Sequence, residues 1–313
     1  MHLLLNKLRV LARKILGRKG TFLLRNIVSA LSINLGLVEK ASLIGKDDCV
    51  SAMVLTYNDP DWLEPSILSV KDLVYEYIVV DSSTDETPKI LVELRDTYNL
   101  NMSIIRLPPG DLVRARNTGL NNVACRWVLI WDADFIAKPE LVTEIRRLIA
   151  QLDNKYYYLV YWPMIKICGD LFHVCKEVYH IEHWLYTWSP KLRYEEIDGH
   201  DSLIAPLTMY RAIMISKPLG YHIVNVRNPK RIAIKHLVWK KPWLKEYLAK
   251  GYSIEEVAKM KAREIYGTDD LEEIGRRIMR KEAEKLPVYD KSIFGDYPEI
   301  LKRYVRKRYG INL

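Results

Sequence analysis

The feature that most constrains the fold is an alternation of strand-like and helix-like segments between residues 49 and 150. Short, mostly apolar segments at residues 50–58, 75–80, 101–107 and 126–131 are typical of buried strands, and each is followed by apolar residues at helical spacing. Strands that alternate with helices are joined by right-handed crossovers and lie parallel. The sequence therefore predicts an α/β fold with a mainly parallel, twisted sheet covered by helices.

The intervening helices are expected at residues 61–74, from Thr87 onward, at 111–124 and at 139–152. Thr87 and Pro88 are typical of the start of a helix, and Asp111 is placed to cap the third helix. These signals set where each helix begins and therefore where the loop before it ends.

The second half of the chain has a different pattern. Residues 156–179 predict a β-hairpin that turns at Gly169–Asp170, residues 180–206 have no regular pattern, and residues 221–226 resemble a strand. From Pro242 to the end the sequence is helical in character. We therefore expect a basic helical arm at residues 1–46, a main domain at 47–240 with two halves (47–150 and 151–240), and a helical C-terminal extension at 241–313.

The positive charge is concentrated at the N-terminus. Residues 1–46 hold nine Lys or Arg and one acid, a net charge of +8, whereas the whole chain carries +9. This distribution argues against binding of nucleic acid over the whole surface and fits an arm directed at an anionic phospholipid surface. Leu4, Leu8, Leu11 and Ile15 form an apolar stripe at helical spacing. The stripe would either pack on the catalytic body or lie in a membrane interface.

Neither the cysteines nor the apolar segments indicate secretion or a membrane span. The four cysteines have no paired spacing, which predicts a reducing compartment. The uncharged stretch from Asn26 to Val38 is shorter than the roughly 20 residues that a spanning helix needs. We therefore expect a cytoplasmic protein, peripheral on the inner face of the cell membrane.

Acidic and amide side chains follow the predicted parallel strands. Asn58 and Asp59 follow the first strand, Asp81 the second, and Asp132 and Asp134 the fourth. Ligands of open parallel sheets bind outside the carboxyl ends of the strands, so these side chains should meet at one edge. Residues 49–150 contain no glycine-rich phosphate-binding motif. Paired carboxylates would instead hold Mg²⁺ or Mn²⁺, which neutralises phosphate oxygens.

Two further side chains are candidates on the helix before the fourth strand. Arg114 and Asn117 are three residues apart and therefore share a helical face. They would contact a diphosphate or ribose, or they would be solvated, and their spacing favours the solvated interpretation.

Three segments together resemble the family 2 glycosyltransferases of the GT-A fold: "VSAMVLTYNDPDWLEPSILSV", "YIVVDSSTDETPKI" and "GDLVRARNTGLNNVACRWVLIWDADF". The resemblance covers residues 49–150. It implies that 47–240 is a catalytic domain, with a nucleotide-sugar half at 47–150 and an acceptor half at 151–240. It implies that Thr56, Asn58 and Asp81 belong to the nucleotide pocket, and that Asp132 and Asp134 belong to the metal–diphosphate site. It also implies that Arg114 and Asn117 lie on the donor-side helix. The loop after the second strand is one residue shorter than the family pattern, so Asp81 is the one clear acid that would contact the base.

A weaker resemblance continues into the second half. "WSPKLRYEEIDGHDSL" and "IAIKHLVWKKPWLKEYLAKGY" are similar to the branch that contains bacterial lipopolysaccharide-core glucosyltransferases. It implies that Asp201 is the catalytic base, with Glu195 and Glu196 as alternatives. His236 falls at a later histidine of the branch and would be a metal or diphosphate partner. Without the resemblance, Asp201 would cap a helix at 202–205, and His236 would be structural.

The predicted function is metal-dependent transfer of a sugar, with inversion, from a nucleotide-diphosphate donor to an acceptor hydroxyl. The acceptor would be a glycan or a lipid-linked glycan at a membrane surface, and no nucleic acid would bind. A phosphatase of the haloacid dehalogenase type also has an Asp-x-Asp after an apolar strand. However, three β/α units precede Asp132 here, and no Thr follows the pair. A catalytically silent, membrane-recruited binding protein is the alternative that is not an enzyme.

Overall fold

The computed structural model describes residues 2–224, 226–238 and 241–313, with side chains from Gly17 onward. The chain divides into two compact units. The first comprises Met1–Pro163 and Ile181–Gly220, and the second comprises Met164–His180 and Tyr221–Leu313. The predicted stripe of Leu4, Leu8, Leu11 and Ile15 lies outside the residues whose side chains are described. Every candidate site residue except His236 belongs to the first unit.

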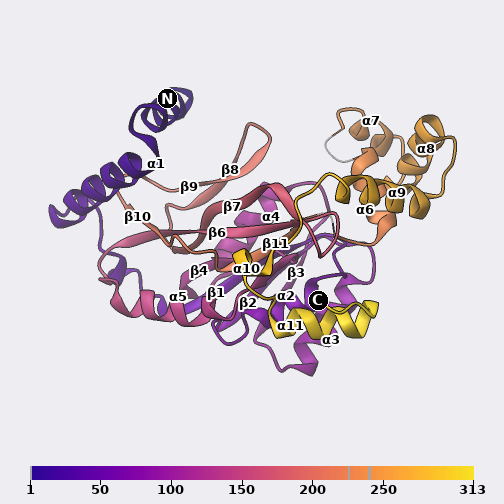
Figure 1. Cartoon of the computed structure of the whole chain (residues 1–313). Helices are drawn as coiled ribbons and strands as arrows, with labels where there is room; N and C mark the ends of the chain where they lie inside the picture. Colours follow the sequence, from indigo (N-terminus) through magenta and orange to yellow (C-terminus); the bar gives the residue numbers. More distant parts are fainter. Residues whose placement is uncertain (1, 225, 239–240) are drawn as a thin grey trace. The chain divides into compact units, whose positions relative to one another are not determined.

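Four parallel strands form the first half of the sheet, as the alternating pattern predicts (Figure 1). They are β1 (Asp47–Thr56), β2 (Glu76–Asp81), β3 (Met102–Arg106) and β4 (Cys125–Ile130), in the order β3-β2-β1-β4. Helices α2 (Leu63–Ser69), α3 (Thr87–Thr97) and α4 (Leu112–Asn122) connect them, and α5 (Glu140–Gln151) follows the short strand β5 (Phe135–Ala137). The α/β fold expected from the sequence is confirmed.

Antiparallel pairing begins beyond β4. Strand β7 (Val174–Thr187) runs antiparallel to β4, and β6 (Tyr157–Cys168) is its other neighbour. Strand β10 (Tyr210–Met214) pairs in parallel with β6. The prediction of irregular structure at 180–206 is wrong, because β7 continues to Thr187 and a separate hairpin follows. That hairpin consists of β8 (Arg193–Ile197) and β9 (His200–Ile204).

Helix α4 lies unusually close to the sheet because Gly119 faces β1. A Cβ atom at Gly119 would lie 2.7 Å from the side chain of Met53, which is fully buried in β1. The cap of this helix is the predicted one, since Asp111 accepts a hydrogen bond from the Arg114 backbone N–H at 2.8 Å. The glycine and the cap together fix the position of α4, which carries the candidate residues Arg114 and Asn117.

We predict that Gly119→Ala destabilises the protein by about 1–3 kcal/mol, because the added methyl overpacks a filled core. Chemical denaturation should show the loss as a lower midpoint with an unchanged slope. Gly45→Ala is not a suitable control because its φ is +75°. Ala150→Gly, at the exposed C-terminal end of α5, serves as a reference for a change in helix propensity that does not alter core packing. An unchanged midpoint in Gly119→Ala would contradict the close approach.

Helix α1 (His2–Asn34) has a break at Gly17, whose φ of 63° and ψ of −178° are not helical. Its second part packs on the first unit beside strand β10. The Asn26 side chain donates to the Ala212 carbonyl at 3.0 Å and accepts from the Ala212 N–H at 2.6 Å, as a neighbouring strand would. The second part of α1 is thus a fixed element of the first unit.

The second unit combines β11 (Gly220–Val224) with helices. These are α6 (Pro229–Val238), α7 (Leu244–Ala249), α8 (Ile254–Tyr266), α9 (Leu271–Ala283), α10 (Lys291–Phe294) and α11 (Glu299–Tyr309). Helices α6, α8 and α9 share an apolar core that includes Ala233, Val257 and Ile274. The helical C-terminal region expected from Pro242 is confirmed, although the helices already begin at Pro229.

The cysteines form two disulfide bonds. Cys49 of β1 is bonded to Cys125 of β4, and Cys168 is bonded to Cys175 across the turn that joins β6 and β7. The expectation of unpaired cysteines is therefore wrong. Strand pairing brings Cys49 and Cys125 together although 76 residues separate them in the sequence.

Candidate functional site

The loops after β1 and β2 are bonded to one another at the carboxyl edge of the sheet. Asn58 has a left-handed backbone, with φ of 48°. Its side-chain oxygen accepts from the Thr84 N–H at 2.7 Å, and its own backbone N–H donates to Ser83 Oγ at 2.7 Å. Thr56 ends β1 beside this loop pair, and its buried Oγ1 has no hydrogen-bond partner in the described part of the chain. A buried, unsatisfied hydroxyl at a strand end is suited to receive a ligand.

Asp81 ends β2 and is fully buried. Its carboxylate accepts hydrogen bonds from the Ser83 N–H at 2.9 Å and from the guanidinium of Arg106, at the end of β3. The Arg106 side chain is half exposed, so its ion pair with Asp81 keeps a positively charged guanidinium at the rim of this edge. The sequence predicted a nucleotide contact for Asp81 but did not identify Arg106 as its partner.

Asp132 and Asp134 follow β4 in a turn that is fixed from both sides. The Asp132 carbonyl accepts from Ser66 Oγ at 3.0 Å and from the Phe135 N–H at 3.0 Å. The neighbouring Trp131 is buried and donates its indole N–H to the Ser66 carbonyl at 3.1 Å. Asp134 is buried, with 8% of its surface exposed. The turn therefore holds two carboxylates on a rigid backbone at the predicted edge.

The central contact of the site is a buried arginine that links two distant acids. Arg116 of α4 donates Nη1 and Nη2 to the two carboxylate oxygens of Asp132, at 2.9 and 3.0 Å. It donates Nε to Oδ2 of Asp201, in β9, at 2.9 Å. The Arg116 side chain is 12% exposed. Burial acts to lower the pKa of Arg116, but Asp132 and Asp201 raise it above its ordinary value, so the guanidinium stays charged.

Arg116 was missed by the sequence analysis, although a signal existed. It lies three residues before Gly119 and four before Leu120, both of which are buried. It therefore shares the inward face of α4, where a charge needs a counter-charge. Arg114 is exposed on the same helix.

Asn117 anchors the β8–β9 hairpin to α4. Its side chain donates to the Tyr194 carbonyl at 2.9 Å and accepts from the Tyr194 N–H at 2.8 Å. Tyr194 is buried, and Arg116 lies over its ring at 6.0 Å. Burial raises the pKa of Tyr194 to about 12, so its phenol is neutral near pH 7. Because Asp201 is on the same hairpin as Tyr194, these contacts position Asp201 near Asp132.

The three acids of the hairpin have different surroundings. Asp201 lies directly opposite Glu196 in the β8–β9 register, so both side chains are on the same face of the hairpin. Glu195 instead pairs with Arg193 at 2.6 Å. The idea that Asp201 caps a helix is wrong, because residues 200–204 form strand β9.

The candidate carboxylate ligands for a divalent cation are Asp132 and Asp134. Within the part of the chain whose side chains are described, no three or more His, Cys, Asp or Glu residues are grouped to hold a metal. Mg²⁺ commonly takes one or two carboxylates and completes its coordination with substrate phosphates and water. Asp134 fits that pattern, with the diphosphate as a further ligand. The metal role of Asp132 stays a prediction, because both of its carboxylate oxygens accept hydrogen bonds from Arg116. His236 lies in α6 of the second unit, 3.4 Å from the Tyr266 hydroxyl, so its metal role stays a prediction.

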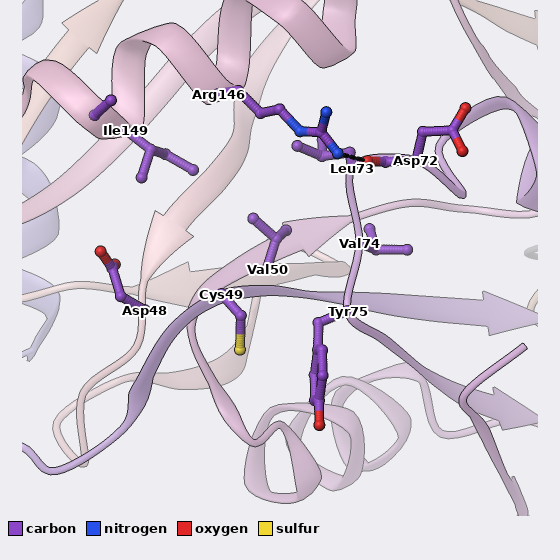
Figure 2. A pocket seen from close by; sticks show the side chains of 10 residues that line it. Asp48, Cys49, Val50, Asp72, Leu73, Val74, Tyr75, Arg146 and Ile149 are labelled. Carbon is purple, nitrogen blue, oxygen red and sulfur yellow. Dashed lines mark hydrogen bonds between the residues drawn. The ribbon is translucent and has the colours of Figure 1, made fainter.

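A hollow of about 400 Å³ lies at the opposite edge of the sheet (Figure 2). Asp48, Cys49 and Val50, at the start of β1, line it together with Tyr75, which precedes β2. Arg146 of α5 donates to the Asp72 carbonyl across it, as Figure 2 shows. Ligands of open α/β sheets bind at carboxyl ends, so this hollow at the amino ends is not the candidate site.

Residues 51–215 match the sequence profile of the family described as glycosyl transferase family 2, which is more than half of the chain. The chain belongs to glycosyl transferase family 2. The match includes every candidate of the first unit, from Thr56 to Asp201. The parallel half followed by antiparallel strands is the GT-A type of α/β architecture that the resemblance implied. Family membership also leaves the phosphatase alternative without support.

Other family members and transferases resemble the chain in part. An uncharacterized glycosyltransferase of Rickettsia bellii is 30% identical over 112 residues, which is 36% of each chain. The chain thus spans about a third of that curated relative. The structure of S. aureus TarS 1-349 in complex with UDP is 16% identical, with coverage of 75% of this chain and 70% of that one and a TM-score of 0.42. The mannosyltransferase PcManGT from Pyrobaculum calidifontis, in complex with GDP-Man and Mn²⁺, is 15% identical, with coverage of 77% and 85% and a TM-score of 0.42.

Proposed function

We propose that the protein is a metal-dependent, inverting glycosyltransferase that transfers a sugar from a nucleotide-diphosphate donor to an acceptor hydroxyl. The observation that carries this proposal is the Arg116 bridge. It joins Asp132, at the carboxyl edge of the parallel strands, to Asp201, on a hairpin contributed by the second half of the first unit. A transferase needs such a junction because donor and acceptor must meet at one point.

The donor nucleotide is proposed to bind at the ends of β1, β2 and β3. The buried hydroxyl of Thr56 offers one hydrogen bond, and the loop held by Asn58 shapes the pocket. Arg106, held by Asp81, supplies a positive charge at the rim. These are polar contacts of the kind that a base and ribose require, and the exposed Arg114 remains a candidate for the diphosphate.

Asp134 is proposed as the main carboxylate ligand of Mn²⁺ or Mg²⁺. Asp132 already gives both oxygens to Arg116, so its role is to orient that guanidinium and the donor side of the site. The bound cation would stabilise negative charge on the departing nucleoside diphosphate. Arg116 brings a further fixed positive charge to the same edge.

Asp201 is proposed as the general base of a single displacement. Arg116 is bonded to Oδ2, which leaves Oδ1 as the oxygen that we assign to the acceptor hydroxyl. As the acceptor oxygen bonds to the anomeric carbon, its proton passes to Asp201 and the bond to the diphosphate oxygen breaks. Attack opposite the leaving group inverts the configuration at that carbon.

The test of this proposal is Arg116→Lys, which keeps the charge but removes the fork that binds two carboxylates. Lysine is a point charge and cannot replace bidentate geometry. We expect kcat to fall by roughly 10²-fold while KM for the donor changes little, because the loss concerns alignment at the reacting atoms. Steady-state kinetics with Mn²⁺ and a cleaved nucleotide-sugar measure both quantities.

Arg147→Lys is the matched control, because Arg147 is exposed on α5 and forms an ion pair with Glu144. Its kinetics should be those of the wild type. A normal kcat in Arg116→Lys would remove the bridge from the mechanism, and equal losses in both variants would point to destabilisation instead.

The acceptor is proposed to be a glycan or lipid-linked glycan presented at a membrane surface. The support is the basic N-terminal sequence, with a net charge of +8 over residues 1–46. No described helix is long and apolar enough to cross a membrane. All four cysteines are in disulfide bonds, so they do not support the expected reducing compartment. The proposed location is therefore a membrane surface, with no compartment assigned.

A further inference from the structure

The second part of α1 exposes apolar side chains, unlike an ordinary surface helix. The side that faces the protein body carries Arg25, Asn26, Ser29 and Ser32, of which all but Asn26 are buried, together with the buried Ile33. The opposite side exposes four apolar residues: Leu23, Leu24, Ile27 and Leu31, with exposures of 62%, 41%, 49% and 55%. A helix that packs on a soluble domain normally turns its apolar stripe inward.

The inward side is held by hydrogen bonds to backbone carbonyls. Ser29 Oγ donates to the Met209 carbonyl at 2.6 Å, and Arg25 donates to the Tyr210 and Ala205 carbonyls at 3.5 and 3.4 Å. With the paired bonds between Asn26 and Ala212, these contacts fix the rotation of the helix about its axis. The apolar side of the helix therefore faces outward, because rotating the helix to bury it would break these hydrogen bonds.

Three further exposed leucines follow the helix end in the sequence. Leu35, Leu37 and Leu43 are 70%, 74% and 65% exposed. Exposed apolar residues on successive turns of a helix, as at Leu23 to Leu31, are typical of an interaction site.

The flanking charge identifies the partner. No acidic residue precedes Glu39, whereas the sequence up to Lys19 contains six basic residues, among which Arg18 and Lys19 are exposed. A basic segment next to an apolar stripe fits an anionic lipid interface, where leucines enter the acyl boundary and lysines contact headgroups. A second copy of the chain fits less well, because two such basic segments would repel one another.

We propose that α1 docks on the surface of an anionic bilayer through Leu23, Leu24, Ile27 and Leu31. This inference deepens the membrane part of the proposed function and rests on it. Because α1 is bonded to β10, which pairs with β6 of the catalytic sheet, docking would place the catalytic unit at the lipid surface. An acceptor in that surface would then diffuse to the enzyme in two dimensions.

The test compares vesicle binding of the full chain and of Leu24→Gln/Ile27→Gln/Leu31→Gln. The vesicles are phosphatidylcholine alone or phosphatidylcholine mixed with phosphatidylglycerol. The wild type should sediment with the anionic vesicles, and the triple variant should lose about tenfold or more of its partition coefficient. A control triple variant alters three exposed apolar residues elsewhere on the first unit, Tyr75→Gln/Val92→Gln/Leu207→Gln, and should bind as the wild type does.

Three outcomes would overturn the docking proposal. They are retained binding in the α1 variant, equal losses in both triple variants, and lipid-free dimers that the α1 variant converts to monomers, seen by sedimentation velocity. Release of nucleoside diphosphate from a soluble nucleotide-sugar, measured on the same proteins, tests the proposed transferase function separately from membrane docking. Vesicle binding without such release contradicts the proposed function and leaves the docking surface standing.

Discussion

Asp134→Asn is expected to lower kcat for sugar transfer by about 10³-fold or more, while the protein stays folded. Asp134 is buried in the turn that follows β4, and we assign the cation to it. An amide at that position keeps the shape of the side chain but removes the charge that would hold Mn²⁺ or Mg²⁺. The diphosphate leaving group would then depart without its main electrostatic stabilisation.

The measurement is kcat as a function of Mn²⁺ concentration, with excess chelator as the end point. The wild type should lose activity in chelator and recover it when Mn²⁺ is restored. Asp96→Asn is the control, because Asp96 is an exposed acid of α3 that pairs with its neighbour Arg95. Full wild-type activity in chelator would contradict a metal-dependent reaction, whatever the result for Asp134→Asn.

Asp201→Asn is expected to lower kcat by about 10²–10⁴-fold, which is the usual contribution of a general base. Asparagine cannot accept the hydroxyl proton, but its oxygen still accepts a hydrogen bond from Arg116. Donor affinity and the Mn²⁺ requirement should therefore remain near those of the wild type. This split between kcat and donor binding separates a base from a residue that only positions the arginine.

Asp198→Asn is a matched control on the same hairpin. Asp198 is exposed in the turn and has a left-handed φ of 51°, a conformation that asparagine also adopts readily. It should leave kcat unchanged. If Asp201→Asn turns over normally, the base is another acid, and Glu196→Gln is the next variant because Glu196 shares the face of Asp201.

The parallel half of the fold was predictable because its signals are local. Each buried strand is a short apolar run, and each helix begins at a recognisable residue, such as Asp111. The acids at strand ends followed from the same pattern, since parallel strands end at one edge. Thus Asp81 and Asp132 were placed at that edge from the sequence, although their partners were not.

The partners are non-local, which explains why they were missed. Arg116 is one of several polar residues of α4, and its bridging role depends on a contact with Asp201, which is 85 residues away in the sequence. The hairpin that carries Asp201 had a signal in Asp198–Gly199, since both residues have positive φ and Asp-Gly favours such a turn. The pairing of Cys49 with Cys125 likewise needs the order of β1 and β4, which no spacing rule gives.

The N-terminal arm shows that the orientation of a helix does not follow from its residue pattern alone. The predicted stripe of residues 4–15 lies outside the described side chains and stays a prediction, whereas the exposed apolar face that the structure describes lies at Leu23 to Leu31. The hydrogen bonds to β10 decide which side is outward. Composition alone cannot reveal this, because polar residues at helical spacing are compatible with either orientation.

The most direct test of the central claim is release of nucleoside diphosphate from a panel of nucleotide-sugars with Mn²⁺, by the wild type and by Asp134→Asn. Transferases of this kind should cleave their donor slowly even when water is the acceptor. We predict release from at least one nucleotide-sugar by the wild type, and none above background by Asp134→Asn. No release from any member of the panel, or equal release by the two proteins, would contradict a metal-dependent transfer site at Asp134.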